Sequence, residues 1–382
     1  MNRAKPYQLA LFPLNNGATN VYFVLILQYI ASFGSNVLGI TAIFASLMVT
    51  GMRIFDAITD PIIGAMMDKT NTKIGKFRPY MILGNVVMAI SVALLYCVTP
   101  MIPADMMLAR IAAYVVLYAV WVIGYTFQTS VTRSAQSVLT NDPKQRPLFA
   151  SFDGVYNTTL FALIGIFYAN SAIKFQDIDP TGMGGYGSTE FFHQIWVFTA
   201  CVSALFTAIA VFSIAPKDRR EFFGTGKAVK VGLKDYWEVL SKNRAIQMLV
   251  LSASTDKLGA SAKTSAVMVA LFACIAGSTK LQGNMTALTT IPSTIITFAC
   301  ISLIAPKVVQ RKAMIIGSIG GIITNLSLIA LWLLGDPTTM TKDPAAGTVY
   351  FGFFTIAYLV LTCVQAGFQG ISGNIVIPMT AD

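Results

Sequence analysis

Long apolar stretches alternate with short polar segments along the whole chain. A helix needs about 20 mostly apolar residues to cross the hydrocarbon core of a bilayer. Stretches of that length predict ten helices, at residues 10–35, 38–67, 78–99, 107–133, 148–173, 192–215, 246–277, 284–306, 313–334 and 347–377. The pattern therefore predicts an all-α polytopic membrane protein.

Composition agrees with that class. Hydrophobic residues make up 55% of the 382 positions and charged residues only 12%, whereas a soluble domain carries about 25% charged residues. The five cysteines lie in apolar segments without the spacing of a metal site or a disulfide framework. With a single histidine, His193, the chain offers no His or Cys constellation, so we expect neither an enzyme nor a cofactor nor a resident metal centre.

The basic residues set the expected orientation. Most of the 27 lysines and arginines fall in the N-terminus and in alternate loops, namely 68–77, 134–147, 216–245 and 307–312. Loops with excess Lys and Arg face the cytoplasm, so the sequence predicts a multi-pass cell-membrane protein with both ends of the chain cytoplasmic. Because the basic residues follow this distribution, membrane orientation accounts for the net charge of +10, and the charge does not indicate nucleic-acid binding.

The longest of these basic loops divides the chain. Residues 1–215 hold six predicted helices, 216–245 form a cytoplasmic central loop, and 246–382 hold four helices. The basic residues after the second helix have a weak echo after the eighth. Two six-helix halves related in this way are the major facilitator fold. By that count the chain is C-terminally short of the usual twelve helices, lacking helices 11 and 12.

Helix 2 carries unusual charges. Arg53, Asp56 and Asp60 are spaced three and four apart, so they share one helix face. A charge at the bilayer centre costs about 2.5–3.5 kcal/mol, so such residues usually serve a function. Pro61 frees the carbonyl of Ala57, and carboxylate and carbonyl oxygens suit a hard cation. The alternative is a structural Arg53–Asp56 pair with Asp60 solvated.

Two further segments are polar inside the predicted spans. In helix 4, Thr126 has a hydroxyl for a cation, while Tyr125, Gln128 and Thr129 have groups for a polar solute; simple interhelical hydrogen bonding is the alternative. Residues 252–265 of helix 7 are too polar to face lipid, so they line a wet cavity or form a loop.

Buried charges outside helix 2 also need partners. We expect Asp153 and Lys257 to pair across a central cavity, with the adjacent Asp256 directed elsewhere. The alternatives are an Asp153–Arg146 pair or separate hydration of each charge. Asp68, beyond the apolar span, is expected in a cytoplasmic gate.

The run from Arg53 to Asp68, followed by Gly75-Lys-Phe-Arg-Pro79, resembles the glycoside-pentoside-hexuronide:cation symporters. The resemblance extends at low density over the whole chain. It implies that Asp56 and Asp60 are cation-site carboxylates. It also identifies Thr126 as the cation-site threonine and Tyr125 as the tyrosine before it. Asn15 and Thr129 stand where the family has two sugar-binding acids. Pro147 stands where the family has an arginine, and Arg146 is adjacent. The cation site is thus retained, and the galactoside-binding acids are not.

These observations predict a cation-coupled symporter of a sugar, glycoside or related polar solute, driven by Na⁺ or H⁺. The predicted residues are Asp56, Asp60 and Thr126 for the cation; Asn15, Tyr125, Gln128, Thr129, Arg146, Asp153, Asp256 and Lys257 for the solute; and Arg53, Asp68 and Arg78 for the gate. A membrane scaffold that binds without transporting is the alternative, but it has no need of charges within its spans.

Overall fold

The computed structural model describes most of the chain in two compact units, Met1–Gly226 and Lys227–Asp382. The described residues are 3–70, 72–140, 142, 145–179, 185–219, 221, 241–244, 246–248, 250–252, 254–255, 272, 276, 279–304, 310–343 and 347–381. Every named element in these ranges is a helix. Each unit is described separately below.

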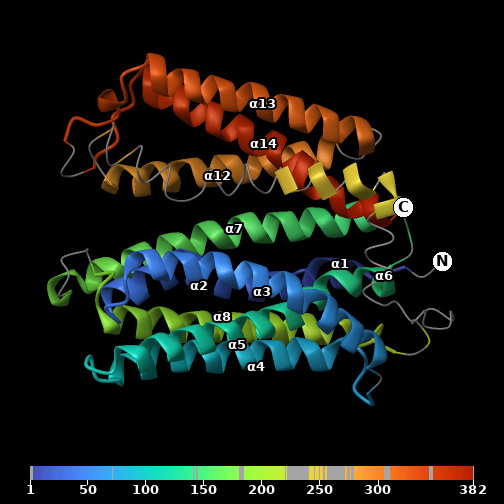
Figure 1. Cartoon of the computed structure of the whole chain (residues 1–382). Coiled ribbons are helices and arrows are strands. Elements are labelled where there is room, and N and C mark those ends of the chain that lie inside the picture. Colours follow the sequence, from blue (N-terminus) through green and yellow to red (C-terminus); the bar gives the residue numbers. More distant parts are fainter. Residues whose placement is uncertain are drawn as a thin grey trace. The chain divides into compact units, whose positions relative to one another are not determined.

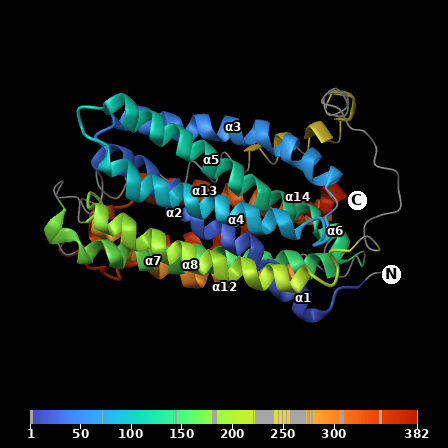
Figure 2. The same cartoon turned by 90° about the horizontal axis from the view of Figure 1, so that it is seen from below.

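The first unit is a bundle of long helices. Its elements are α1 (Pro6–Leu11), α2 (Leu14–Asn36), α3 (Ala42–Lys69), α4 (Arg78–Ala93, continued by a π-helical turn, Leu94–Val98), α5 (Met107–Ser134), α6 (Gln136–Leu139), α7 (Gln145–Lys174) and α8 (Thr189–Ile214). Helix α2 packs against α3, α5, α7 and α8, so it forms the centre of the unit, and α3 and α5 lie side by side (Figure 2).

The second unit contains α12 (Thr279–Ile304), α13 (Gln310–Leu334) and α14 (Phe353–Ala381). Helices α12 and α13 both pack along α14 (Figure 1). Edge-to-face rings join α13 to α14, with Trp332 at 5.7 Å from Phe354 and 6.1 Å from Tyr358 between ring centroids. Such pairs add about 0.5–1.5 kcal/mol beyond area burial.

Helix α3 has two different faces. Ile54, Ile58, Ile62 and Met66 recur every four residues and are exposed, each at 49–63% of its full surface. Four-residue spacing keeps them on one stripe. A stripe of large exposed apolar side chains suits lipid contact, and it leaves the charged residues of α3 on the other side of the helix.

Helices α4 and α5 approach unusually closely at two glycines. A Cβ atom built on Gly84 would lie 2.7 Å from the carbonyl oxygen of Gly124, and one on Gly124 would lie 3.0 Å from that of Gly84. Small residues allow such backbone contact between membrane helices. The contact fixes the position of α5, which carries the polar residues of predicted helix 4.

The prediction of ten spans is not confirmed as a count. Among the described residues, seven helices are long and apolar enough to cross a membrane, and α7 and α12 are not among them. Both are long helices at predicted positions, and the part of α12 from Leu288 to Thr297 is apolar but too short by itself to span. The predicted seventh span, 246–277, lies largely outside the described residues.

Candidate functional site

Two helices bring the predicted cation-site residues together. Helix α3 carries Asp56 and Asp60, and α5 runs beside it with Thr126. The Thr126 hydroxyl, which is fully buried, donates to Asp56 Oδ1 at 2.8 Å. The carbonyl oxygen of Val122 lies 3.0 Å from the same hydroxyl, as its alternative acceptor. The contact joins residues 70 positions apart, so the predicted grouping of Asp56 with Thr126 exists in space.

Asp60 has a partner that was not predicted. Its Oδ2 atom lies 3.9 Å from Nη1 of Arg133, which is in the last turn of α5. The Asp60 side chain is 38% exposed and the Arg133 side chain 73%. Exposed pairs of this length are weak, so a cation has no strong ion pair to displace here. Arg133 had no local signal, because a basic residue at the cytoplasmic end of a span is ordinary.

A small pocket adjoins Asp56. Its lining is Met52, Arg53, Asp56, Tyr118, Trp121, Val122 and Tyr125. The Arg53 guanidinium lies 4.8 Å from the ring centroid of Phe23, and Tyr125 stacks on Phe23 at 5.8 Å and on Trp121 at 5.3 Å. The negative faces of aromatic rings attract a guanidinium.

The position of Arg53 is distant from the other residue that was predicted for the gate on α3. The residue stands beside Asp56, and 15 residues of helix at 1.5 Å per residue separate it from Asp68 by roughly 22 Å. Arg53 therefore lies with the pocket residues, and its role in the gate stays a prediction.

Two predicted solute residues form hydrogen bonds between helices, and their role in solute binding stays a prediction. Asn15 Nδ2 donates to the backbone carbonyl of Gln128 at 3.0 Å and to the Thr132 hydroxyl at 2.8 Å. Gln128 Nε2 donates to Asn15 Oδ1 at 3.0 Å and to the Thr207 hydroxyl at 2.7 Å. Asn15 and Gln128 are fully buried, so the network ties α2, α5 and α8 together. The Thr129 hydroxyl bonds to the carbonyl of Tyr125 on its own helix, at 3.0 Å.

The remaining predicted solute residues divide into two groups. Asp153, on α7, accepts a hydrogen bond from Asn16 Nδ2 at 2.9 Å. Asp256, Lys257 and the side chain of Arg146 lie outside the described residues. The pair of Asp153 with Lys257, and the alternative pair with Arg146, therefore stay predictions.

Asp68 and Arg78, two of the predicted gate residues, belong to separate ion pairs. Asp68, at the end of α3, accepts from Lys76 Nζ at 2.8 Å and is 71% exposed. Arg78 pairs with Asp218, whose carboxylate is fully buried just after α8, and the Nε to Oδ2 distance is 3.3 Å. Asp68 and Arg78 are thus near each other in sequence but have different partners.

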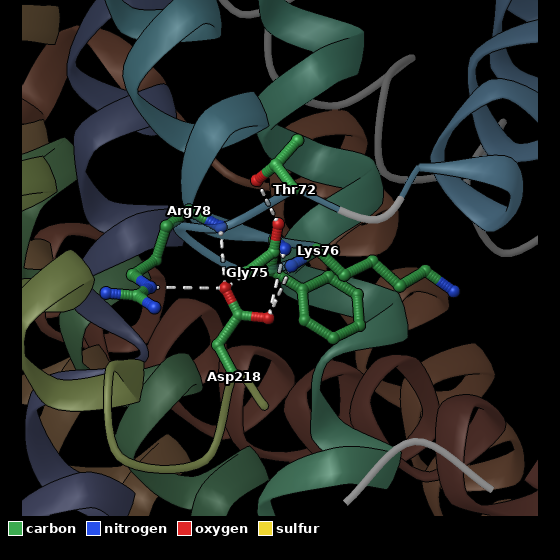
Figure 3. A network of polar contacts seen from close by, with 6 residues as sticks. Thr72, Gly75, Lys76, Arg78 and Asp218 are labelled. Atoms are coloured by element: carbon green, nitrogen blue, oxygen red, sulfur yellow. Dashed lines mark hydrogen bonds and ion pairs between the residues drawn. The ribbon is translucent and has the colours of Figure 1, made fainter. Parts of the chain in front are cut away.

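Asp218 is the main residue that sequence reasoning missed. Its carboxylate accepts from the backbone N–H groups of Lys76 at 2.8 Å, Phe77 at 3.1 Å and Arg78 at 3.0 Å (Figure 3). These amides open α4, where N–H groups have no intrahelical partner and attract negative charge. Gly75 has φ +125°, and a Cβ there would lie 2.1 Å from Asp218 Oδ2. The only signal was one acid within a basic run at residues 217–220.

Comparison with known proteins gives the context of this arrangement. Relatives include the inner membrane symporter YicJ of Escherichia coli (24% identical; 59% of this chain and 46% of the relative), the raffinose carrier protein of Pediococcus pentosaceus (25%; 52% and 30%) and the isoprimeverose transporter of Lactiplantibacillus pentosus (26%; 61% and 46%). The matched part of the chain spans less than half the length of each.

A family model described as MFS/sugar transport protein matches residues 13–373, which is nearly the whole chain. The match confirms the predicted resemblance to glycoside-pentoside-hexuronide symporters, and it agrees with a multi-pass transporter that is not an enzyme. The chain belongs to the MFS/sugar transport protein family.

Proposed function

We propose that this protein is a cation-coupled symporter of a sugar or glycoside, and that Asp56, Asp60 and Thr126 hold the coupling cation. The hydrogen bond of 2.8 Å from Thr126 to Asp56 carries the proposal. Two carboxylates on one face of α3 and a hydroxyl from α5 are hard oxygen donors, the ligands that alkali and alkaline-earth ions prefer. A proton at either carboxylate is the other coupling ion that this chemistry allows.

Arg133 supplies the counter-charge of the empty state. Its guanidinium is 3.9 Å from Asp60. Arrival of a cation between the carboxylates weakens that contact and leaves Arg133 free for a solute oxygen. Cation and solute then each favour the presence of the other, which is a coupling free energy between two sites. Release of both ligands before the empty carrier returns gives alternating access.

The basic loops and the apolar helices also support a location and an orientation in the membrane. We propose a cell-membrane protein whose N-terminus is cytoplasmic, as the basic loops favour. Lys73 and Lys76, after α3, then lie on the cytoplasmic side with the Asp218 carboxylate. The exposed apolar stripe of α3 faces lipid.

Uptake into proteoliposomes tests this function. The 382-residue chain is reconstituted, and uptake of radiolabelled raffinose and isoprimeverose is followed with an inward Na⁺ gradient, an inward pH gradient or neither. One gradient should stimulate uptake of at least one sugar, and Asp56→Cys and Asp60→Cys should abolish that stimulation while the protein remains folded. Full stimulation in both variants would refute the assignment of the cation site. No uptake with either gradient would refute symport of these sugars.

A further inference from the structure

Helices α2 and α7 face each other through an ordered series of side-chain pairs. Asn16 Nδ2 donates to Asp153 Oδ1 at 2.9 Å, and Asn20 Nδ2 donates to Asn157 Oδ1 at 2.9 Å. Both pairs join residues 137 positions apart, so they are successive steps of one register. We call these four residues the polar ladder.

An aromatic pair continues the polar ladder. Phe23 of α2 packs edge to face on Phe161 of α7, with 6.0 Å between ring centroids. Phe23 also stacks on Tyr125, the neighbour in sequence of the cation-site threonine, Thr126. The ladder therefore leads directly to the rings beside the cation site.

The four polar side chains retain hydrogen-bonding capacity. In the described part of the chain, the ladder bonds use Oδ1 of Asp153 and Oδ1 of Asn157. Asp153 Oδ2 and Asn157 Nδ2 have no partner among the described residues. Asn16, Asp153 and Asn157 are partly exposed, whereas Asn20 is buried with 9% of its surface exposed.

A pair elsewhere in the unit shows what a purely structural contact looks like. Asn85 Nδ2 donates to the Ser203 hydroxyl at 2.6 Å between α4 and α8, and the Ser203 hydroxyl donates in turn to the Ala18 carbonyl. Both side chains are buried. This pair is closed to its surroundings, whereas three of the four ladder residues are partly exposed and the ladder has spare hydrogen-bonding atoms.

Building on the function proposed above, we propose that Asn16, Asn20, Asp153 and Asn157 form the hydroxyl-binding subsite for a neutral glycoside, with Phe23 as its apolar wall. A carboxylate oxygen accepts from sugar hydroxyls, and an amide both donates and accepts. Charge-assisted hydrogen bonds are the stronger ones, so Asp153 is the dominant contact. Sites of this kind combine aromatic surface with a few placed polar groups.

The charge of Asp153 selects among sugars. A uronate replaces a hydroxymethyl group with a carboxylate, and two like charges near each other repel. In the described residues no cationic side chain lies within ion-pair distance of Asp153. The subsite should therefore prefer a neutral glycoside to the matching uronide by about tenfold.

Equilibrium binding with a matched pair of probes tests the proposal. The full chain, purified in detergent with saturating Na⁺ at neutral pH, is titrated with methyl β-glucoside and with methyl β-glucuronide. We expect Asp153→Asn, which keeps the side-chain shape, to weaken glucoside binding about tenfold and to remove the preference over the glucuronide. Asn157→Leu should also weaken glucoside binding. Asn85→Ala, the control for a structural pair, should lower thermal stability and leave both dissociation constants within twofold.

The outcomes separate this inference from the function on which it rests. Native preference for the glucuronide, or an unchanged ratio of the two constants in Asp153→Asn, would overturn the neutral-glycoside subsite and leave sugar symport intact. Uptake of neither raffinose nor isoprimeverose under any gradient, with no binding of either methyl glycoside, would remove the proposed function and the subsite together. If Asn157→Leu does not fold, the isosteric Asp153→Asn decides the matter.

Discussion

Replacing Asp218 with asparagine should destabilise the first unit far more than replacing Asp68. Both carboxylates contact the segment between α3 and α4, but their surroundings differ. Asp218 is fully buried and accepts from three backbone amides and from Arg78. Asp68 is 71% exposed and has Lys76 as its ion-pair partner.

The structure sets the size of the effect. An asparagine at 218 turns one acceptor oxygen into a donor that faces the amides of Phe77 and Arg78. Removing one partner of a buried ion pair costs about 3–5 kcal/mol. Arg78 is 21% exposed and regains some hydration, so we expect about 3 kcal/mol. For a unit of this size that corresponds to roughly 6–12 °C in melting temperature. An exposed pair such as Asp68–Lys76 contributes about 1 kcal/mol at most.

Thermal melting of the purified variants in detergent measures the difference. Gly75→Ala is a second route to the same damage, because its Cβ would occupy the position of Asp218 Oδ2. The double variant of Gly75 and Asp218 should lose less than the sum of the single losses, since both break one contact. Asp68→Asn should melt within about 3 °C of native protein and slow transport with little change in ligand affinity. Equal melting temperatures for the Asp218 and Asp68 variants would refute this reasoning.

Three further outcomes follow from other contacts. Gly84→Leu should lower the free energy of unfolding by about 1–3 kcal/mol, because its side chain has no room beside α5. Gly64→Ala is the control, because nothing lies within 4 Å of its Cβ, and it should melt as native protein does. Similar melting temperatures of the two variants would contradict the close contact of α4 and α5. Arg133→Gln removes the charge beside Asp60 and should tighten Na⁺ binding by no more than about fivefold in a titration. Weaker Na⁺ binding would contradict a competition between Arg133 and the cation for Asp60. In a cysteine-free background, an impermeant maleimide added outside should label Asp177→Cys and miss Lys73→Cys, and the reverse pattern would overturn the topology.

The sequence predicts local patterns well in this protein and long-range partners poorly. Asp56 and Asp60 share a face of α3 because of their spacing, and the resemblance selects Thr126 as their neighbour, which the structure brings to 2.8 Å from Asp56. Asn15 and Gln128 have the side chains of solute-binding residues, but no pattern along one helix reveals that they face each other. Asp218 is a stronger example, because its partners lie 140 or more positions away.

Hydropathy is also misleading where polar residues line helix contacts. Helix α7 contains Asp153 and Asn157, which lower its apolar character although they pair with α2. An interhelical hydrogen bond in a membrane contributes about 0.6 kcal/mol on average. Such residues therefore add little stability, and a composition-based count of spans leaves out helices such as α7.

The role of the Thr126 hydroxyl is the most direct test of the central claim, that its contact with Asp56 forms part of the cation site. Sugar uptake is measured in proteoliposomes against Na⁺ concentration and, separately, against pH, for Thr126→Ser and Thr126→Val. Serine keeps the hydroxyl that lies 2.8 Å from Asp56, and valine keeps the shape without it. We predict near-native cation stimulation for serine and an apparent cation affinity lowered about tenfold or more for valine. Native cation affinity in Thr126→Val would contradict the account.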